Sequence, residues 1–209
     1  MTRIEQLIST YPDLDICAPD LQAAFEVLRD CFRRGGKVLT CGNGGSAADA
    51  EHIVGELMKG YLLKRAVPDE VRAKLLAGSP QDGDYLAQHL QGALPAISLV
   101  SQTSLLSAIA NDTAADMVFA QQVYAYGREG DTLLGLSTSG NARNVIHAMQ
   151  VAHALGLHTV ALTGPTGGML KPFCEVCIRV PGENTSAIQE RHLPIYHGLC
   201  AMLEEEFFA

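Results

Sequence analysis

Two side chains that can bind metal and move protons, His52 and Glu56, lie four residues apart in the segment CGNGGSAADAEHIVGEL (41–57). Four residues make about one turn of an α-helix, so both side chains share one face. An imidazole and a carboxylate on one face can be two ligands of a divalent ion or an acid–base pair. Taken singly, each also fits a hydrogen-bonded histidine or a solvated carboxylate.

A second set of such side chains lies near the C-terminus, in TSAIQERHLPIYHGL. Pro194 is disfavoured inside a helix, so we expect the C-terminal helix to restart near Leu193, after Gln189. On one straight helix Gln189 and His197 would be about 12 Å apart along the axis, too far to share one ion directly. A break between them, or contributions from two subunits, would remove this difficulty. The combined set suits zinc or another first-row divalent ion: His52, Glu56, Gln189 and His197.

Two glycine- and hydroxyl-rich turns have the composition of phosphate sites. The first, GNGGSAAD, has glycines that let the backbone approach a ligand and a predicted N-cap, Ser46. Free N–H groups in the following helical turn attract anions. The second turn, LSTSGNARN, has three consecutive hydroxyl residues, Ser137, Thr138 and Ser139. Ordinary helix capping is the alternative for each turn, and the Asn111-Asp112 pair fits a simple polar turn. Neither turn has the GxGxxG or GK[ST] pattern of a nucleotide site.

Apolar runs typical of strands alternate with helical patterns along the chain. The expected strands are 37–42, 94–100, 131–137, 158–164 and 175–182, and the expected helices are 19–34, 46–64, 102–110, 116–127, 142–155 and 194–207. This alternation predicts an α/β fold with a parallel sheet and helices on both faces. Ligands of such sheets bind at the carboxyl ends of the strands, which is where both phosphate-like turns lie.

One segment does not fit this alternation. Residues 64–93 contain a helix start at Pro68 and the turn GSPQDGD, so we expect an inserted helical hairpin. About 30 residues cannot build an independent core. The chain is therefore expected to be one domain over 1–209, with an N-terminal helical segment at 1–35.

Composition narrows the function classes. The 209 residues are 47% hydrophobic, and a formal net charge of −8 argues against non-specific nucleic-acid binding. Residues 1–12 have no signal-peptide pattern and no apolar run has membrane-spanning length, so we expect a cytoplasmic protein without membrane contact. The six cysteines are expected to be reduced core residues. Cys174 and Cys177 have the spacing of a redox or zinc pair, but no second pair accompanies them.

Five motifs, in this order, resemble those of the phosphoheptose isomerases of the sugar-isomerase (SIS) superfamily. They are CGNGGSAADAEH with Glu56, SAIANDTAADMVF, GREGDTLLGLSTSGNARNVI, VALTG with a following GG, and IQERH with His197. The resemblance covers most of the chain and implies a three-layer αβα sandwich with a five-stranded parallel sheet. It implies a homotetramer with sites at subunit interfaces. The implied reaction converts sedoheptulose 7-phosphate to D-glycero-D-manno-heptose 7-phosphate through an enediol, with metal assistance.

The resemblance also implies a role for each matching residue. Glu56 would be the catalytic base and His197 the acid. About one zinc or other divalent ion per site would be held by His52, Glu56, Gln189 and His197. The implied substrate contacts are Asn43, Gly44, Gly45, Ser46, Asp112, Ser137, Thr138, Ser139 and Gln189.

Three departures from the family pattern leave alternatives open. Ala142 replaces the usual serine after SGN, Ser186 replaces a frequent aspartate, and the 64–93 segment is additional. Because of the Ala142 and Ser186 departures, the protein could instead be an isomerase of another sugar phosphate, such as a pentose or hexose phosphate. A further alternative is a non-enzymatic SIS-domain protein of the type that associates with the replication initiator. That relative lacks the His and Glu metal positions, so their retention here favours the enzyme.

Overall fold

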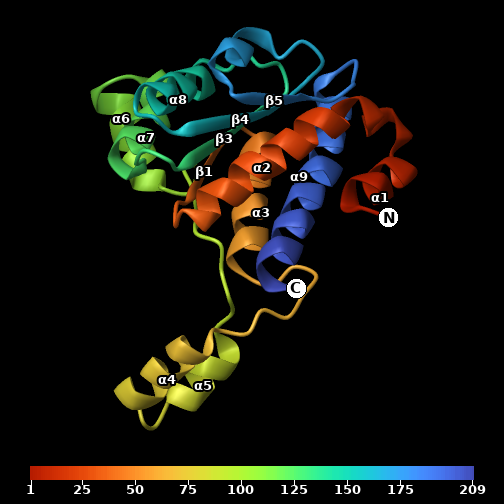
Figure 1. Ribbon diagram of the computed structural model, residues 1–209. Helices are drawn as coiled ribbons and strands as arrows, with labels where there is room; N and C mark the ends of the chain where they lie inside the picture. Colours follow the sequence, from red (N-terminus) through yellow and green to blue (C-terminus); the bar gives the residue numbers. More distant parts are fainter.

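Five short apolar strands form one parallel sheet in the computed structural model, which describes residues 1–209 (Figure 1). The strands are β1 (Val38–Cys41), β2 (Ala96–Ser98), β3 (Thr132–Ser137), β4 (His158–Thr163) and β5 (Val176–Arg179). Their order in the sheet is β2-β1-β3-β4-β5. The predicted five-stranded α/β fold is confirmed, and each strand lies within its predicted range. The order reverses between β1 and β3, so a ligand crevice is expected at their carboxyl ends.

Helices cover both faces of the sheet (Figure 1). Strand β3 shows why, because Leu133 and Leu134 point to opposite faces and join two different apolar clusters. The first face carries α2 (Ala18–Arg33), α3 (Gly45–Met58) and α9 (Thr185–Phe208), with α1 (Arg3–Thr10) packed on α9 and η1 (Pro12–Cys17) between α1 and α2. The second face carries α6 (Thr103–Asp112), η2 (Ala115–Met117), α7 (Ala120–Tyr126), α8 (Arg143–Ala154) and η3 (Gly168–Phe173).

Helices α3 and α9 lie side by side and run in the same direction. Near the start of both helices, Gly45 of α3 lies against the Gln189 side chain of α9. Further along, His52 of α3 hydrogen bonds to Tyr196 of α9. Beyond the end of α3, the Tyr61 N–H donates to Glu204 near the end of α9. The three contacts follow in the same order along both helices, so residues far apart in the sequence lie next to one another.

The predicted break at Pro194 is wrong, because α9 is one continuous helix from Thr185 to Phe208. A proline inside a helix removes one backbone hydrogen bond and costs about 3 kcal/mol or more. Against this cost, α9 buries Ile188, Ile195 and Leu199, each 8% exposed or less. Each buried side chain of this kind contributes about 1.5–3 kcal/mol, so the apolar face of α9 outweighs the proline.

The 64–93 segment forms the predicted helical hairpin. It consists of α4 (Asp69–Gly78) and α5 (Gly83–His89), which pack on each other and project away from the sheet and its helices (Figure 1). An isolated bridge between Ala66 and Gln91 closes its base. Helix α3 ends at Met58, short of the predicted residue 64. Residues 59–68, which we call the strap, lead from α3 to the hairpin.

Two further observations concern composition-based predictions. All six cysteines are free, four of them buried and Cys174 and Cys177 half-buried. No helix has both the length and the apolar character needed to cross a membrane.

Candidate functional site

The two phosphate-like turns lie next to each other at the switch point of the sheet. The first follows β1 and the second follows β3, and these strands are neighbours. Asn43 of the first turn and Asn144 at the start of α8 exchange two amide hydrogen bonds of 2.8 Å. The turns therefore form one polar surface at the carboxyl edge of the sheet, as the sequence predicts.

The first turn is shaped by Gly44 rather than capped by Ser46. Gly44 has a φ of +55°, which a residue with a side chain rarely adopts, and it occupies the N-cap position of α3. Ser46 lies one residue inside the helix with its side chain buried, so its predicted role as N-cap is wrong. The first N–H groups of α3 remain the anion-attracting feature of this turn.

The second turn is held from behind by another glycine turn. Gly140 has a φ of +66°, and an added Cβ there would lie 2.1 Å from the Gly167 carbonyl oxygen. Along the three hydroxyl residues the exposure increases, with Ser137 buried, Thr138 half-buried and Ser139 exposed. The Ser139 Oγ accepts a 3.1 Å hydrogen bond from the Asn141 N–H.

A second polar cluster lies on the facing sides of α3 and α9. The His52 Nε2 and the Glu56 Oε1 are 3.2 Å apart, and the Glu56 side chain is only 12% exposed. The rings of His52 and His197 pack edge to face with 5.0 Å between their centroids. The structure thus brings together three of the four predicted metal ligands, which include the predicted base and the predicted acid.

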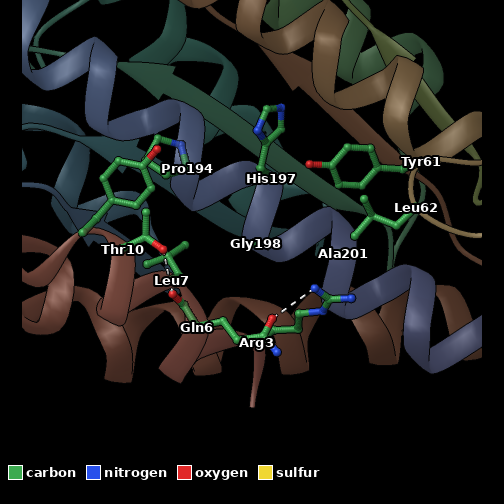
Figure 2. Close-up of a pocket in the computed structure, with 11 residues that line it drawn as sticks. Arg3, Gln6, Leu7, Thr10, Tyr61, Leu62, Pro194, His197, Gly198 and Ala201 are labelled. Carbon is green, nitrogen blue, oxygen red and sulfur yellow. Dashed lines mark hydrogen bonds between the residues drawn. The ribbon is translucent and has the colours of Figure 1, made fainter. Parts of the chain in front are cut away.

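His197 is the member of this cluster with an unpaired ring nitrogen. Its Nε2 is buried and has no hydrogen-bond partner. Burial and the nearby charge of His52 lower the pKa of His197, which favours a neutral ring with a free lone pair. His197 lines a cavity of about 250 Å³. Figure 2 shows Tyr61 next to His197, and Arg3 and Gln6 of α1 opposite.

The His52 and Glu56 pair has the atom types and spacing of two ligands of a divalent ion. Two ligand atoms at about 2.0–2.2 Å from one tetrahedral zinc ion are roughly 3.3–3.5 Å apart, close to the 3.2 Å between His52 Nε2 and Glu56 Oε1. The unpaired Nε2 of His197 is a third donor of the right type. Nevertheless, no three His, Cys, Asp or Glu side chains converge as a metal-binding group.

Gln189 does not join this cluster within one chain. Because α9 is continuous, eight residues separate Gln189 from His197 by about 12 Å along the axis. The Gln189 amide instead lies over Gly45, where an added Cβ would be 1.7 Å from its Nε2. Gln189 therefore connects the first phosphate-like turn to α9.

Asp112 and Ser186 stay outside both groups. Asp112 ends α6 with an exposed carboxylate, which accepts a hydrogen bond from the Asn111 side chain. Ser186 is exposed in the first turn of α9. Neither makes a hydrogen bond or ion pair with His52, Glu56 or His197.

Three aromatic or acidic residues of the site were missed from the sequence. The Tyr196 hydroxyl contacts His52 and Asp49, and the Tyr61 ring lies 5.5 Å from that of His197. The spacing of Asp49 and His52, three residues apart on α3, could have indicated that both side chains face the same neighbour. No sequence signal pairs either tyrosine with α3.

Comparisons with known proteins agree with this fold. A model of the SIS domain matches residues 14–77 and 86–164. A phosphoheptose isomerase from Rhodospirillum rubrum is 40% identical over 189 residues, which cover 90% of this chain and 87% of that protein.

Two solved structures extend the comparison to three dimensions. A phosphoheptose isomerase from Neisseria gonorrhoeae is 33% identical, with a TM-score of 0.70 over 95% of this chain and 98% of the other. One from Francisella tularensis is 30% identical, with a TM-score of 0.73 over 98% and 100% of the two chains. The chain therefore belongs to the phosphoheptose isomerase family of SIS-domain enzymes.

Proposed function

We propose that this protein interconverts sedoheptulose 7-phosphate and D-glycero-D-manno-heptose 7-phosphate. The observation that carries the proposal is the juxtaposition of a nearly buried carboxylate, Glu56, with two imidazoles, His52 and His197. The names of the relatives support the substrate, since each is a phosphoheptose isomerase. These side chains also oppose the alternative of a non-enzymatic binding protein, which has no need for them.

The reaction moves a proton between C1 and C2 of the sugar through an enediol, so it requires a base and an acid. Glu56 is the base, because its carboxylate faces the site from α3 and is largely withdrawn from water. His197 is the acid that serves the sugar oxygens, since an imidazole can take up and return a proton and its ring packs on that of His52, the neighbour of Glu56.

The two turns at the sheet edge hold the phosphate of the substrate. Ser46 and His52 are six residues apart on α3, or about 9 Å along the helix, so the phosphate lies remote from the reacting carbons. Its binding energy then orients the sugar without taking part in the proton transfer. Ser139, exposed at the second turn, is well placed to donate to the phosphate.

The proposal includes one divalent ion per site, most suitably zinc. His52, Glu56 and His197 would hold it, and Gln189 would reach the same ion from a second subunit. When bound, such an ion polarises the substrate carbonyl and orients both reacting oxygens.

A homotetramer with sites at subunit interfaces is part of the proposal. Apolar side chains near the N-terminus are only partly buried within the chain, among them Ile4 and Leu7, which pack on the first apolar cluster. Exposed apolar side chains near the site add support, Leu62 at 51% and Leu193 at 40%. Sedimentation at micromolar concentration should show a tetramer, and a monomer would contradict this part of the proposal.

Turnover of C5–C7 ketose phosphates in deuterated water tests the reaction. Sedoheptulose 7-phosphate should be the preferred substrate, with deuterium entering the product at C2 and the recovered ketose at C1. Glu56→Gln should lose about 10²–10⁴ in kcat, the usual contribution of a positioned base. Glu51→Gln on the same helix is the control, because the exposed Glu51 carboxylate bonds only to Ser101.

Metal content must be measured on the same samples. A folded, metal-replete Glu56→Gln protein with near wild-type kcat would exclude Glu56 as the base. A metal-free wild-type protein with full activity would exclude the ion. Preference for a pentose or hexose phosphate would support the isomerisation but exclude sedoheptulose 7-phosphate as the preferred substrate.

A further inference from the structure

The Tyr196 hydroxyl lies at the centre of the contact between α3 and α9. The residue is 1% exposed, and its ring packs edge to face on the His52 ring at 5.4 Å between centroids. The hydroxyl oxygen is 3.0 Å from His52 Nδ1 and 3.2 Å from Asp49 Oδ1. Asp49 and His52 are three residues apart on α3, so they flank the hydroxyl from one helix face.

The hydrogen atoms of this group can be assigned from chemistry. The Tyr196 hydroxyl has one hydrogen, and an ionised carboxylate can only accept. The hydroxyl therefore donates to Asp49, which leaves its oxygen to accept from an N–H at His52 Nδ1. The second Asp49 oxygen, Oδ2, is buried without a partner, which strengthens the need for the hydrogen bond at Oδ1.

The proton on Nδ1 determines what the other ring nitrogen can do. With Nδ1 protonated, a neutral His52 has its lone pair on Nε2, the atom 3.2 Å from Glu56 Oε1. A lone pair and a carboxylate oxygen at this distance repel unless a proton or a metal cation lies between them. Two metal ligands can have this arrangement, with an outer hydrogen bond that fixes the histidine tautomer and orientation.

We infer that Tyr196 is a positioning residue for His52, whose hydroxyl, anchored by Asp49, keeps the Nε2 lone pair directed toward Glu56 and a shared divalent ion. The inference rests on the proposed function only for the identity of the ion. Tyr196 acts through His52 and touches neither the substrate nor the reacting atoms.

Tyr196→Phe tests the inference, because it keeps the buried ring and removes only the hydroxyl. Zinc affinity, measured by competition with a chromophoric chelator, should fall 10- to 100-fold, the usual cost of losing such an outer hydrogen bond. In zinc-loaded wild-type protein, nitrogen-15 NMR should show the His52 proton on Nδ1 in a slowly exchanging N–H. In the variant that N–H should exchange rapidly with water.

Two further variants separate positioning from folding. Tyr126→Phe is the matched control, since Tyr126 is half-buried against the second apolar cluster and should leave zinc affinity unchanged. Asp49→Asn should also weaken zinc binding. Combining it with Tyr196→Phe should add less than about threefold, because contacting residues in one network do not act additively. Melting temperatures of all variants show whether any loss reflects unfolding.

The possible outcomes distinguish this inference from the proposed function. Equal zinc affinity and equal Nδ1–H exchange in wild type and Tyr196→Phe would overturn the inference and leave the isomerase intact. A wild-type protein that binds no zinc would also overturn it. A wild-type protein that binds zinc tightly, needs Tyr196 to do so and isomerises no ketose phosphate would support it while removing the proposed function.

Discussion

The guanidinium of Arg65 is fully buried and joins the strap after α3 to α9. It donates to Glu204 Oε1 at 2.8 Å and to the carbonyl oxygens of Leu57 and Glu56 at 2.7 and 2.9 Å. These carbonyls belong to the last turn of α3, where the carbonyl oxygens have no hydrogen-bond donors within the helix. Glu204 also accepts backbone N–H groups from residues 61, 62 and 63. Arg65 therefore fixes both the end of α3 that carries Glu56 and the strap that carries Tyr61.

The pKa of Glu204 shows how burial and hydrogen bonding compete in its pair with Arg65. Burial acts to raise the pKa of Glu204, but the N–H groups of Tyr61 and Leu62 and the Arg65 side chain outweigh burial and lower it. The charged form is thus the one that the fold stabilises. Arg65→Ala would leave that buried charge without its cation and the Glu56 carbonyl without the Arg65 donor, while the Leu57 carbonyl would keep only the Leu94 N–H.

The expected magnitude follows from burial. Removing one partner of a buried ion pair costs about 3–5 kcal/mol, whereas an exposed pair contributes about 0–1 kcal/mol. Arg72 and Asp84 supply the matched control, because their ion pair has the same 2.8 Å separation but side chains 50% and 55% exposed. Arg65→Ala should therefore lower the free energy of unfolding by about 3–5 kcal/mol and Arg72→Ala by less than about 1 kcal/mol.

Thermal unfolding at one protein concentration measures this difference. In a chain of this size each kcal/mol shifts Tm by about 2–4 °C, so Arg65→Ala should lower Tm by roughly 6–20 °C. Arg65→Lys keeps the charge but replaces the planar fork of donors with a compact ammonium that matches the acceptor positions less well, so its Tm should lie between those of wild type and Arg65→Ala. Equal losses for Arg65→Ala and Arg72→Ala would refute the argument from burial.

Three further predictions address the two turns and the core. Gly45→Ala should change the free energy of unfolding by less than about 1 kcal/mol yet lower kcat/KM by about 10²-fold, because its methyl would displace the Gln189 amide. Gly55→Ala, whose methyl meets no atom within 4 Å, is the control, and equal kinetics would contradict the prediction. Ser139→Ala should lower kcat/KM by roughly 10- to 150-fold, mainly through KM and with zinc content unchanged, since a hydrogen bond to a charged phosphate contributes about 1.5–3 kcal/mol; unchanged kcat/KM would remove Ser139 from the phosphate site. Burial lowers the pKa of His192 from 6.5 to about 4, and the Thr163 backbone offsets only part of this. As the pH falls, His192 therefore becomes protonated in the unfolded state before it does in the folded state. This should lower the free energy of unfolding by about 2 kcal/mol between pH 7.5 and pH 5. Urea unfolding of His192→Met should lack that loss, and the same pH dependence in both proteins would exclude His192 as its source.

The sequence by itself determined the five strands, the helical hairpin and the positions of the two turns. Runs of apolar residues separated by helical patterns were enough to predict the five strands, because strands of a covered parallel sheet must be apolar on both faces. The four-residue spacing of His52 and Glu56 fixed their common helix face, and their 3.2 Å contact agrees with it. These features are local, so they depend on periodicity and turn chemistry alone.

Only the tertiary structure decided which helices meet and what lies between them. The parallel packing of α3 on α9 brings His197 and Tyr196 to His52, although about 144 residues separate them. Pro194 predicts a helix break from local cost alone, and the burial of α9 on the sheet reverses that outcome. The Arg65 and Glu204 pair is likewise invisible in the sequence, because its charges are tolerated only where distant backbone groups converge on them. Long-range packing decides these contacts because each depends on the free energy of burying whole helix faces, which no local pattern encodes.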